Sequence, residues 1–409
     1  MTDRNQSFHR ELRVWLKKTS CFTPREIEAL VTILGMLIGS PVFSLNQVAK
    51  RAPQKFGRNF LTKCLMKYAY VQREIARRAF TDMSSQLKQR GKKLVVLDDT
   101  LVKKCGKKIR GSFKWYDHTI RRQVQGFCIV NVAVVVDAHL LFIIPWILWK
   151  QGKPNRQRIS ANKEQDAKTL AAIEMIQTII GWFVEIEVPE KHLVVIADAW
   201  YGNKTMQAFI KQTGSDCRID CRKNYSVQVP NPSAIKARGQ QKRGRKRTKF
   251  VSYKPLEQYM GNSSLWDYFT DPKTQERVSY KIATVTLKAA GRVTIYAFKW
   301  VNQSSPKFIM VRAFRKSRPT PQTVYFQYKL RWRIEEAHRD LKQQFGLRKC
   351  QARDGWVVQG FIGLVYLGYS LWKRLSFLAS QLATIPLKCP SWAQAFHQGQ
   401  IVAEMLAGG

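Results

Sequence analysis

The sequence predicts an α/β fold in which a helical region precedes a mixed core of strands and helices. Three observations support this prediction. Helix-start signals recur over the first 90 residues, continuous apolar runs of strand length begin at residue 92, and both kinds of pattern alternate to about residue 222. Short continuous apolar runs are typical of strands buried on both faces, whereas apolar residues spaced three and four apart indicate a helix. A strand-rich stretch and a final helical region follow.

The chain is long and strongly basic. Its 409 residues exceed the size at which one hydrophobic core usually stops growing, so we expect more than one structural unit. Lys and Arg total 70 against 28 Asp and Glu, which leaves a net charge of +42 spread along the chain. DNA is the expected partner, because binding to phosphates releases condensed counterions. A membrane surface or a structured RNA would attract the same charge.

Cysteine usage and hydropathy bear on the compartment. The eight cysteines are scattered without a repeated C-x-x-C pair, so we expect reduced, packed thiols. The first residues lack the apolar segment of a signal peptide. The apolar run 356–372 is shorter than the roughly 20 residues that span a bilayer, so it predicts a buried helix. We therefore expect a cytoplasmic, nucleoid-associated protein without a membrane partner.

Residues 1–90 are predicted to form a helical DNA-binding domain. Thr23 and Glu26 form a capping box with Pro24 at the first helical position, Ser44 opens a second helix, and a third begins at Asn59. Basic residues recur along these helices, namely Lys50, Arg51, Lys55, Arg58, Lys63 and Lys67. The alternative is a basic bundle with a purely structural role, since helix-turn-helix signals are weak in one sequence.

Residues 91–222 and 317–350 are predicted to form the core. Strand-like runs cover 94–97, 124–136, 140–148, 193–197 and 218–222, and helical spacing covers 165–182 and 204–212. Residues 137–139 have the composition of a hairpin connection. The resulting order is strand, strand, strand, helix, strand, helix, strand. That order is the one found in the RNase H-like fold.

Residues 223–316 are predicted to be a β-rich basic insertion, and residues 351–409 a helical C-terminal region. Strand-like runs lie at 280–287, 293–300 and 308–313. The segment 236–249 holds eight Lys or Arg residues in fourteen. Its expected DNA contacts are Lys242, Arg243, Arg245, Lys246 and Arg247. A solvated loop is the alternative interpretation of such a charge run.

Two acidic positions follow buried strands of the predicted core. Asp98 and Asp99 follow the run 94–97, and Asp198 follows the run 193–197. Carboxylates gathered beside an apolar core repel one another unless cations are present. Carboxylate oxygens are the ligands that Mg²⁺ and Mn²⁺ prefer. The pair of positions therefore indicates a nuclease-like metal site.

The segment 328–342 supplies a third acidic position. On a single helix turning about 100° per residue, Tyr328, Arg331, Glu335 and Lys342 would fall within an arc of about 60°. Apolar residues collect on the opposite side, so the helix could pack on the sheet and present this polar face to the acidic residues. An ordinary amphipathic helix with charge pairs four residues apart is the alternative.

The spacing Y-x2-R-x3-E-x6-K, with RWRIEE inside it, resembles the signature helix of the bacterial insertion-sequence DDE transposases of the cut-and-paste type. The segments LDDT and IADAWYG resemble the places where that family carries its two aspartates, and the likeness covers roughly residues 90–350. The resemblance implies that Asp98, Asp198 and Glu335 hold two Mg²⁺ or Mn²⁺ ions. It also implies that Tyr328, Arg331 and Lys342 contact DNA near the cleaved end. The family pattern D-x-T favours Asp98, with Asp99 as the alternative ligand.

The expected function is that of a DNA transposase. Such an enzyme binds the terminal inverted repeats of its element, cleaves at the ends and joins the 3′-hydroxyl to target DNA by two-metal-ion phosphoryl transfer. Pairing two ends calls for two active sites, so we expect a homodimer in the complex with double-stranded DNA. His338 and His118 are expected to pack or to contact DNA rather than act as catalytic bases. The alternatives are an RNase H-like nuclease or resolvase without strand transfer, and a catalytically silent DNA-binding regulator.

Overall fold

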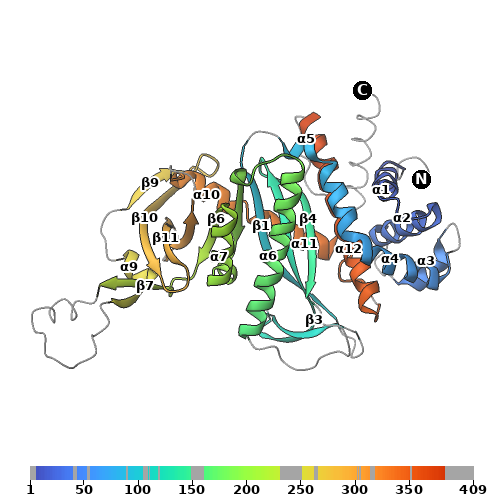
Figure 1. Ribbon diagram of the computed structural model, residues 1–409, viewed down its shortest axis with the longest axis horizontal. Helices are drawn as coiled ribbons and strands as arrows, with labels where there is room; N and C mark the ends of the chain where they lie inside the picture. Colours follow the sequence, from blue (N-terminus) through green and yellow to red (C-terminus); the bar gives the residue numbers. More distant parts are fainter. Residues whose placement is uncertain are drawn as a thin grey trace, which may run out of the picture. The chain divides into compact units, whose positions relative to one another are not determined.

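The computed structural model describes residues 6–39, 44–52, 56–88, 91–104, 109, 111–117, 120–148, 161–230, 251–261, 266–301, 303, 305–313, 318–350 and 352–382 (Figure 1). The chain divides into two compact units, unit 1 with Met1–Pro189 and Trp332–Gly409, and unit 2 with Glu190–Arg331. Several residues singled out above lie outside the described residues, namely Lys55, His118, Lys242, Arg243, Arg245, Lys246 and Arg247.

Unit 1 begins with helices. They are α1 (Gln6–Lys18), α2 (Pro24–Gly39), α3 (Leu45–Arg51), α4 (Arg58–Thr81) and α5 (Ser84–Leu87). The predicted capping box is confirmed, because Thr23 Oγ1 accepts from the Glu26 backbone N–H at 3.3 Å and Glu26 Oε2 accepts from the Thr23 N–H at 2.8 Å. Ser44 caps α3 through the Gln47 N–H at 3.2 Å. The helical prediction for this region is therefore correct, and its role in binding DNA stays a prediction.

An antiparallel sheet forms the centre of unit 1. Its strands are β1 (Lys93–Lys103), β2 (Phe113–Asp117), β3 (Arg122–Val136) and β4 (His139–Leu148). The strand β3 pairs with β1 along one edge and with β2 and β4 along the other. The predicted β3–β4 hairpin is confirmed, and its turn residues Asp137 and Ala138 have φ values of 47° and 66°. Positive φ at both turn positions suits the right-handed twist of the paired strands.

Three long helices of unit 1 pack on this sheet. They are α6 (Ala161–Glu185), α11 (Trp332–Gln343) and α12 (Gly355–Leu382). The helix α6 packs on β3 and β4, α12 packs on β4, and α11 packs on β1 and β4 (Figure 1). The part of α6 from Asp166 to Glu185 is long and apolar enough to cross a membrane by length and composition, but its packing is that of a core helix. The prediction of a buried helix at 356–372 is confirmed by α12.

Unit 2 combines a parallel strand pair with a strand-rich region. Its elements are β5 (Leu193–Ala197), α7 (Lys204–Thr213), β6 (Asp216–Cys221), β7 (Ser226–Pro230), β8 (Val251–Pro255), α9 (Leu256–Gly261), β9 (Asp267–Thr270), β10 (Arg277–Leu287), β11 (Gly291–Trp300), β12 (Lys307–Arg312) and α10 (Pro321–Lys329). The strands β5 and β6 run parallel with α7 between them in sequence, and β12 pairs antiparallel with β6. The predicted strands of residues 280–313 are thus present and extend the sheet from β6. The protein is a mixed α/β protein, compatible with an RNase H-like core.

Close packing between α12 and α4 yields a stability prediction. A Cβ atom added at Gly360 in α12 would lie 1.8 Å from the carbonyl oxygen of Leu65 in α4, so the two helices would have to separate. We expect Gly360→Ala to lower the free energy of unfolding by about 3 kcal/mol, as overpacked interiors do. The measurement is the midpoint of urea unfolding followed by circular dichroism.

The matched control for this substitution is Gly181→Ala in α6. A Cβ atom at Gly181 meets nothing within 4 Å. Alanine favours a helix over glycine by about 1 kcal/mol, so this variant should be as stable as the original chain or slightly more stable. Equal unfolding midpoints for the two variants would contradict the packing argument.

Candidate active site

The two adjacent aspartates of β1 point to opposite faces of the sheet. Asp98 is paired with Asn131 of β3, and Asp99 is paired with Val130. Directly opposed residues of antiparallel strands share a face, and successive residues of one strand alternate between faces. Asp98 therefore lies on the same face as Asn131, and Asp99 lies on the other. Both aspartates sit within β1, which continues to Lys103, so the prediction that the strand ends at Asp98 is wrong.

Asp99 is engaged in an ion pair on its own face of the sheet. Lys168 Nζ of α6 donates to Asp99 Oδ2 at 2.9 Å, and Cys128 Sγ lies 3.5 Å from the same oxygen. The Lys168 and Asp99 side chains are 10% and 21% exposed. Lys168 Nζ also lies 5.9 Å from the centre of the Trp115 ring. The charge of Asp99 is thus balanced inside unit 1 by a partner fixed on α6.

Asp98 lies on the face of the sheet that α11 covers. Its Oδ1 accepts from the backbone N–H of Asp99 at 2.8 Å. The neighbouring Asn131 is fully buried, and its Nδ2 lies 2.8 Å from Nε2 of His338 in α11. The cross-strand neighbour of Asp98 is therefore in direct contact with α11.

Glu335 and Lys342 share the side of α11 that faces β1. With about 100° per residue, Glu335, His338 and Lys342 fall within about 60° of one another around the helix axis. Burial lowers the pKa of Lys342 to about 8, Arg348 adds to this shift, and the Asp98 carboxylate acts against it. Lys342 is thus close enough to Asp98 to sense its charge. The contacts of His338 and Lys342 together turn the Glu335 side of α11 toward Asp98.

The single helix predicted over 328–342 is wrong. Helix α10 ends at Lys329, and α11 begins at Trp332. At the end of α10 the Arg331 N–H bonds to the carbonyl of Tyr328 at 3.0 Å, which closes a tight turn. No glycine or proline marks this turn, so helical spacing continues through it in the sequence. Tyr328 and Arg331 belong to unit 2, whereas Glu335 and Lys342 belong to unit 1.

Tyr328 is packed inside unit 2. Its side chain is buried, with Lys307 Nζ 4.9 Å and the Arg331 guanidinium carbon 5.8 Å from the ring centre. Burial raises the pKa of Tyr328, and the Asp220 carboxylate adds to that rise. The phenol therefore stays protonated and is surrounded by cationic groups, which leaves Arg331 as the more accessible of the two predicted DNA contacts.

Asp198 directly follows the fully buried strand β5, as the sequence predicted. Its Oδ1 accepts from the Trp200 N–H at 2.9 Å and caps a short 3₁₀ helix in unit 2. Burial raises the pKa of nearby Tyr225 to about 12, and the Asp198 carboxylate contributes to this rise. The Tyr225 hydroxyl donates to the carbonyl of Ala199 at 2.9 Å. These contacts hold the backbone just after Asp198 in place.

The oxygen donors of unit 1 suit a hard divalent cation. Asp98 and Glu335 are both half-buried and carry carboxylates on the facing sides of β1 and α11. Within the described ranges, no group of three His, Cys, Asp or Glu side chains is gathered closely enough to hold a metal. Carboxylates repel one another without a cation, so an open arrangement is the expected state of such ligands before metal binds. Mg²⁺ is commonly held by only one or two protein carboxylates together with substrate phosphate.

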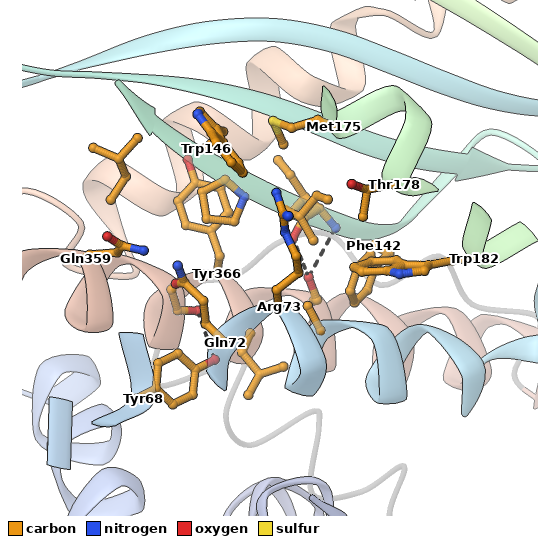
Figure 2. Close-up of a pocket in the computed structure, with 18 of the residues that line it drawn as sticks. Tyr68, Gln72, Arg73, Phe142, Trp146, Met175, Thr178, Trp182, Gln359 and Tyr366 are labelled. Carbon is orange, nitrogen blue, oxygen red and sulfur yellow. Dashed lines mark hydrogen bonds between the residues drawn. The ribbon is translucent and has the colours of Figure 1, made fainter. Parts of the chain in front are cut away.

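A cavity elsewhere in unit 1 contains none of the predicted acidic residues. It has a volume of about 440 Å³ and is lined by residues of α4, β4, α6 and α12 (Figure 2). Trp146, Trp182 and Tyr366 contribute aromatic walls. The Arg73 guanidinium carbon lies 4.8 Å from the Trp146 ring centre, and Arg73 is ion-paired with Glu174 at 2.8 Å. This apolar lining lacks the carboxylates that phosphoryl transfer would need.

Sequence reasoning missed Asn131. It is the one polar residue in the otherwise apolar and buried run 127–136. That isolation is a signal the sequence carries, because a buried amide costs free energy unless it is hydrogen-bonded. The sequence does not show that Asn131 lies beside Asp98, because that neighbourhood follows from the pairing of β1 with β3.

A known protein family matches most of the chain. A family model described as "Transposase DDE domain" matches residues 89–371. The matched span includes β1 with Asp98, β5 followed by Asp198, and α11 with Glu335. No curated protein matches the chain significantly.

Proposed function

The chain belongs to the transposase DDE-domain family, and from this premise we propose that it is a DNA transposase that cleaves and joins DNA. In the proposed reaction it binds terminal inverted repeats, cleaves at the ends of its element and joins the 3′-hydroxyl to target DNA. The observation that carries the proposal is the match of a transposase DDE domain to residues 89–371. The contact between Asn131, which pairs with Asp98 in the sheet, and His338 of α11, one turn from Glu335, supports it.

We assign the metal-holding role to Asp98, Asp198 and Glu335. The family generally uses divalent metal ions. Two Mg²⁺ or Mn²⁺ ions, when bound, would activate the attacking water or 3′-hydroxyl and stabilise the leaving oxygen. Asp98 is favoured over Asp99 because Asp99 is already neutralised by Lys168 on the opposite face of the sheet.

The cationic residues would hold the DNA in place for this chemistry. Lys342 stands on the α11 side that faces Asp98, so its ammonium group is placed to contact a phosphate beside the reacting one. We propose the same kind of contact for Tyr328 and Arg331. The predicted contacts of the basic insertion are Lys242, Arg243, Arg245, Lys246 and Arg247, and the helices of residues 1–90 would add to them. A homodimer would supply one active site for each end, acting on DNA in the nucleoid.

A joining assay tests the proposal. The protein is incubated with Mg²⁺, a target plasmid and pre-cleaved duplexes carrying the DNA that flanks its gene, with either a 3′-hydroxyl or a 3′-dideoxy end. We expect only the 3′-hydroxyl duplex to be joined to the plasmid, since the hydroxyl is the attacking group. Binding and joining should both weaken steeply with salt, because the protein carries 70 Lys and Arg residues.

The outcomes separate the alternatives. Cleavage of intact ends without joining of 3′-hydroxyl ends would support a nuclease or resolvase instead of a transposase. Specific binding that is insensitive to metal, with neither cleavage nor joining, would support a silent regulator.

A further inference from the structure

A buried polar pair joins the sheet of unit 1 to α11. Asn131 is fully buried in β3, and His338 is 8% exposed in α11. The Asn131 Nδ2 and His338 Nε2 atoms are 2.8 Å apart. Burial raises the pKa of the Tyr366 phenol of α12, and nearby Asn131 acts against that rise. The Asn131 Nδ2 also donates to the carbonyl of Ile129 in its own strand at 3.1 Å, so its contact with a helix is the one to His338 of α11.

Stability alone gives little reason for this pair. Burying an amide costs about 1–3 kcal/mol unless a hydrogen bond compensates. Replacing both partners of a buried hydrogen bond with apolar groups of the same shape is often neutral or stabilising. A buried polar pair favours one relative position of the two elements that carry it, because every other position would leave buried polar groups without a hydrogen bond. Relative to an apolar pair of the same shape, the polar pair therefore lowers the stability of the fold.

Both residues of the pair are neighbours of the proposed metal ligands Asp98 and Glu335. Asn131 is the in-register partner of Asp98, and His338 follows Glu335 by one turn of α11. One hydrogen bond therefore links the strand position beside Asp98 to the helix position beside Glu335. Two further hydrogen bonds of α11 lie away from this position: Arg333 Nε donates to the carbonyl of Ala138 at 2.8 Å, and Asp340 Oδ2 accepts from Tyr369 at 3.0 Å.

We propose that Asn131 and His338 are a positioning pair that fixes the rotation and axial position of α11 against β1 and β3. The pair thereby sets the separation of the Asp98 and Glu335 carboxylates. The inference rests on the proposed function, and it adds Asn131 and His338 to the residues on which DNA cleavage depends. Neither residue touches the reacting phosphate. Their effect passes through the geometry of the two carboxylates.

The test is a double variant, Asn131→Leu with His338→Phe, made in the full chain. Both replacements keep the branched or ring shape and remove the hydrogen bond. We expect the thermal midpoint to stay within a few degrees of the original value or to rise. Mn²⁺ affinity, measured from the electron paramagnetic resonance signal of free Mn²⁺, should fall about 10–100-fold, as it does when groups that orient metal ligands are removed. The single-turnover cleavage rate should fall with it, while the Kd for DNA stays unchanged.

Two single variants serve as controls. His338→Gln places an amide near the original Nε2 position, so it should keep both Mn²⁺ affinity and cleavage within about fivefold of the original chain, a penalty of about 1 kcal/mol. Ser370→Ala removes the bonds between Ser370 and the backbone of Ile143 at 3.1 and 3.2 Å. It should lower the thermal midpoint without changing Mn²⁺ affinity, which separates loss of stability from loss of positioning.

Two results would overturn the inference. One is a stable double variant with the original Mn²⁺ affinity and cleavage rate. The other is a double variant that does not fold, since the pair would then be a structural requirement. The proposed function stands or falls separately, on whether Glu335→Gln remains able to cleave DNA.

Discussion

Glu335→Gln is expected to lower the rate of DNA-end cleavage by about 10³-fold, because the amide keeps the shape of the side chain but loses the charge that holds a cation. Metal-assisted stabilisation of the transition state is worth several kcal/mol, and about 4 kcal/mol corresponds to that factor. DNA affinity should change little, since phosphate contacts come from cationic residues. Single-turnover cleavage and fluorescence anisotropy with labelled end DNA measure the two quantities.

The adjacent Glu336 provides a matched control. Its carboxylate pairs with Arg333 on α11 at 2.8 Å, and its side chain is 27% exposed. A pair of this kind contributes less than about 1 kcal/mol, so Glu336→Gln should cleave DNA at close to the original rate. Equal rates for the Glu335 and Glu336 variants would remove Glu335 from the active site.

Asp98→Asn and Asp99→Asn are expected to differ sharply, although the residues are adjacent. Asp98→Asn should reduce cleavage about as much as Glu335→Gln, because the carboxylate faces α11. Asp99→Asn should act on stability, because it leaves Lys168, whose side chain is 10% exposed, without its anion. Removing one partner of a buried ion pair costs about 3 kcal/mol. Urea unfolding and single-turnover cleavage at low temperature separate the two effects.

A second substitution sharpens this comparison. In Asp99→Asn with Lys168→Met the uncompensated cation is gone, so stability should recover while cleavage persists. Loss of cleavage in that stable double variant, together with an active Asp98→Asn, would make Asp99 the metal ligand and reverse the assignment.

Local patterns in the sequence were enough to predict most of the elements. The continuous apolar runs became β1, β3, β4 and β5, the helical spacing became α6 and α7, and the apolar run 356–372 became α12. These predictions succeed because each depends only on neighbouring residues: a continuous apolar run of strand length for a strand buried on both faces, and a period of 3.6 for a helix. The spacing around Glu335 identified the family, which the match over residues 89–371 confirmed.

The sequence by itself thus determined the fold class, the family and a short set of acidic candidates. Only the tertiary structure decided that Asp98 faces α11 while Asp99 faces α6, and that Asn131 meets His338. It also showed that the expected signature helix is interrupted, because α10 ends at Lys329 and α11 begins at Trp332. The physical reason is that strand register and helix docking depend on partners far apart in the sequence, 69 residues for Asp99 and Lys168 and 207 for Asn131 and His338. No local period encodes which face such partners will cover.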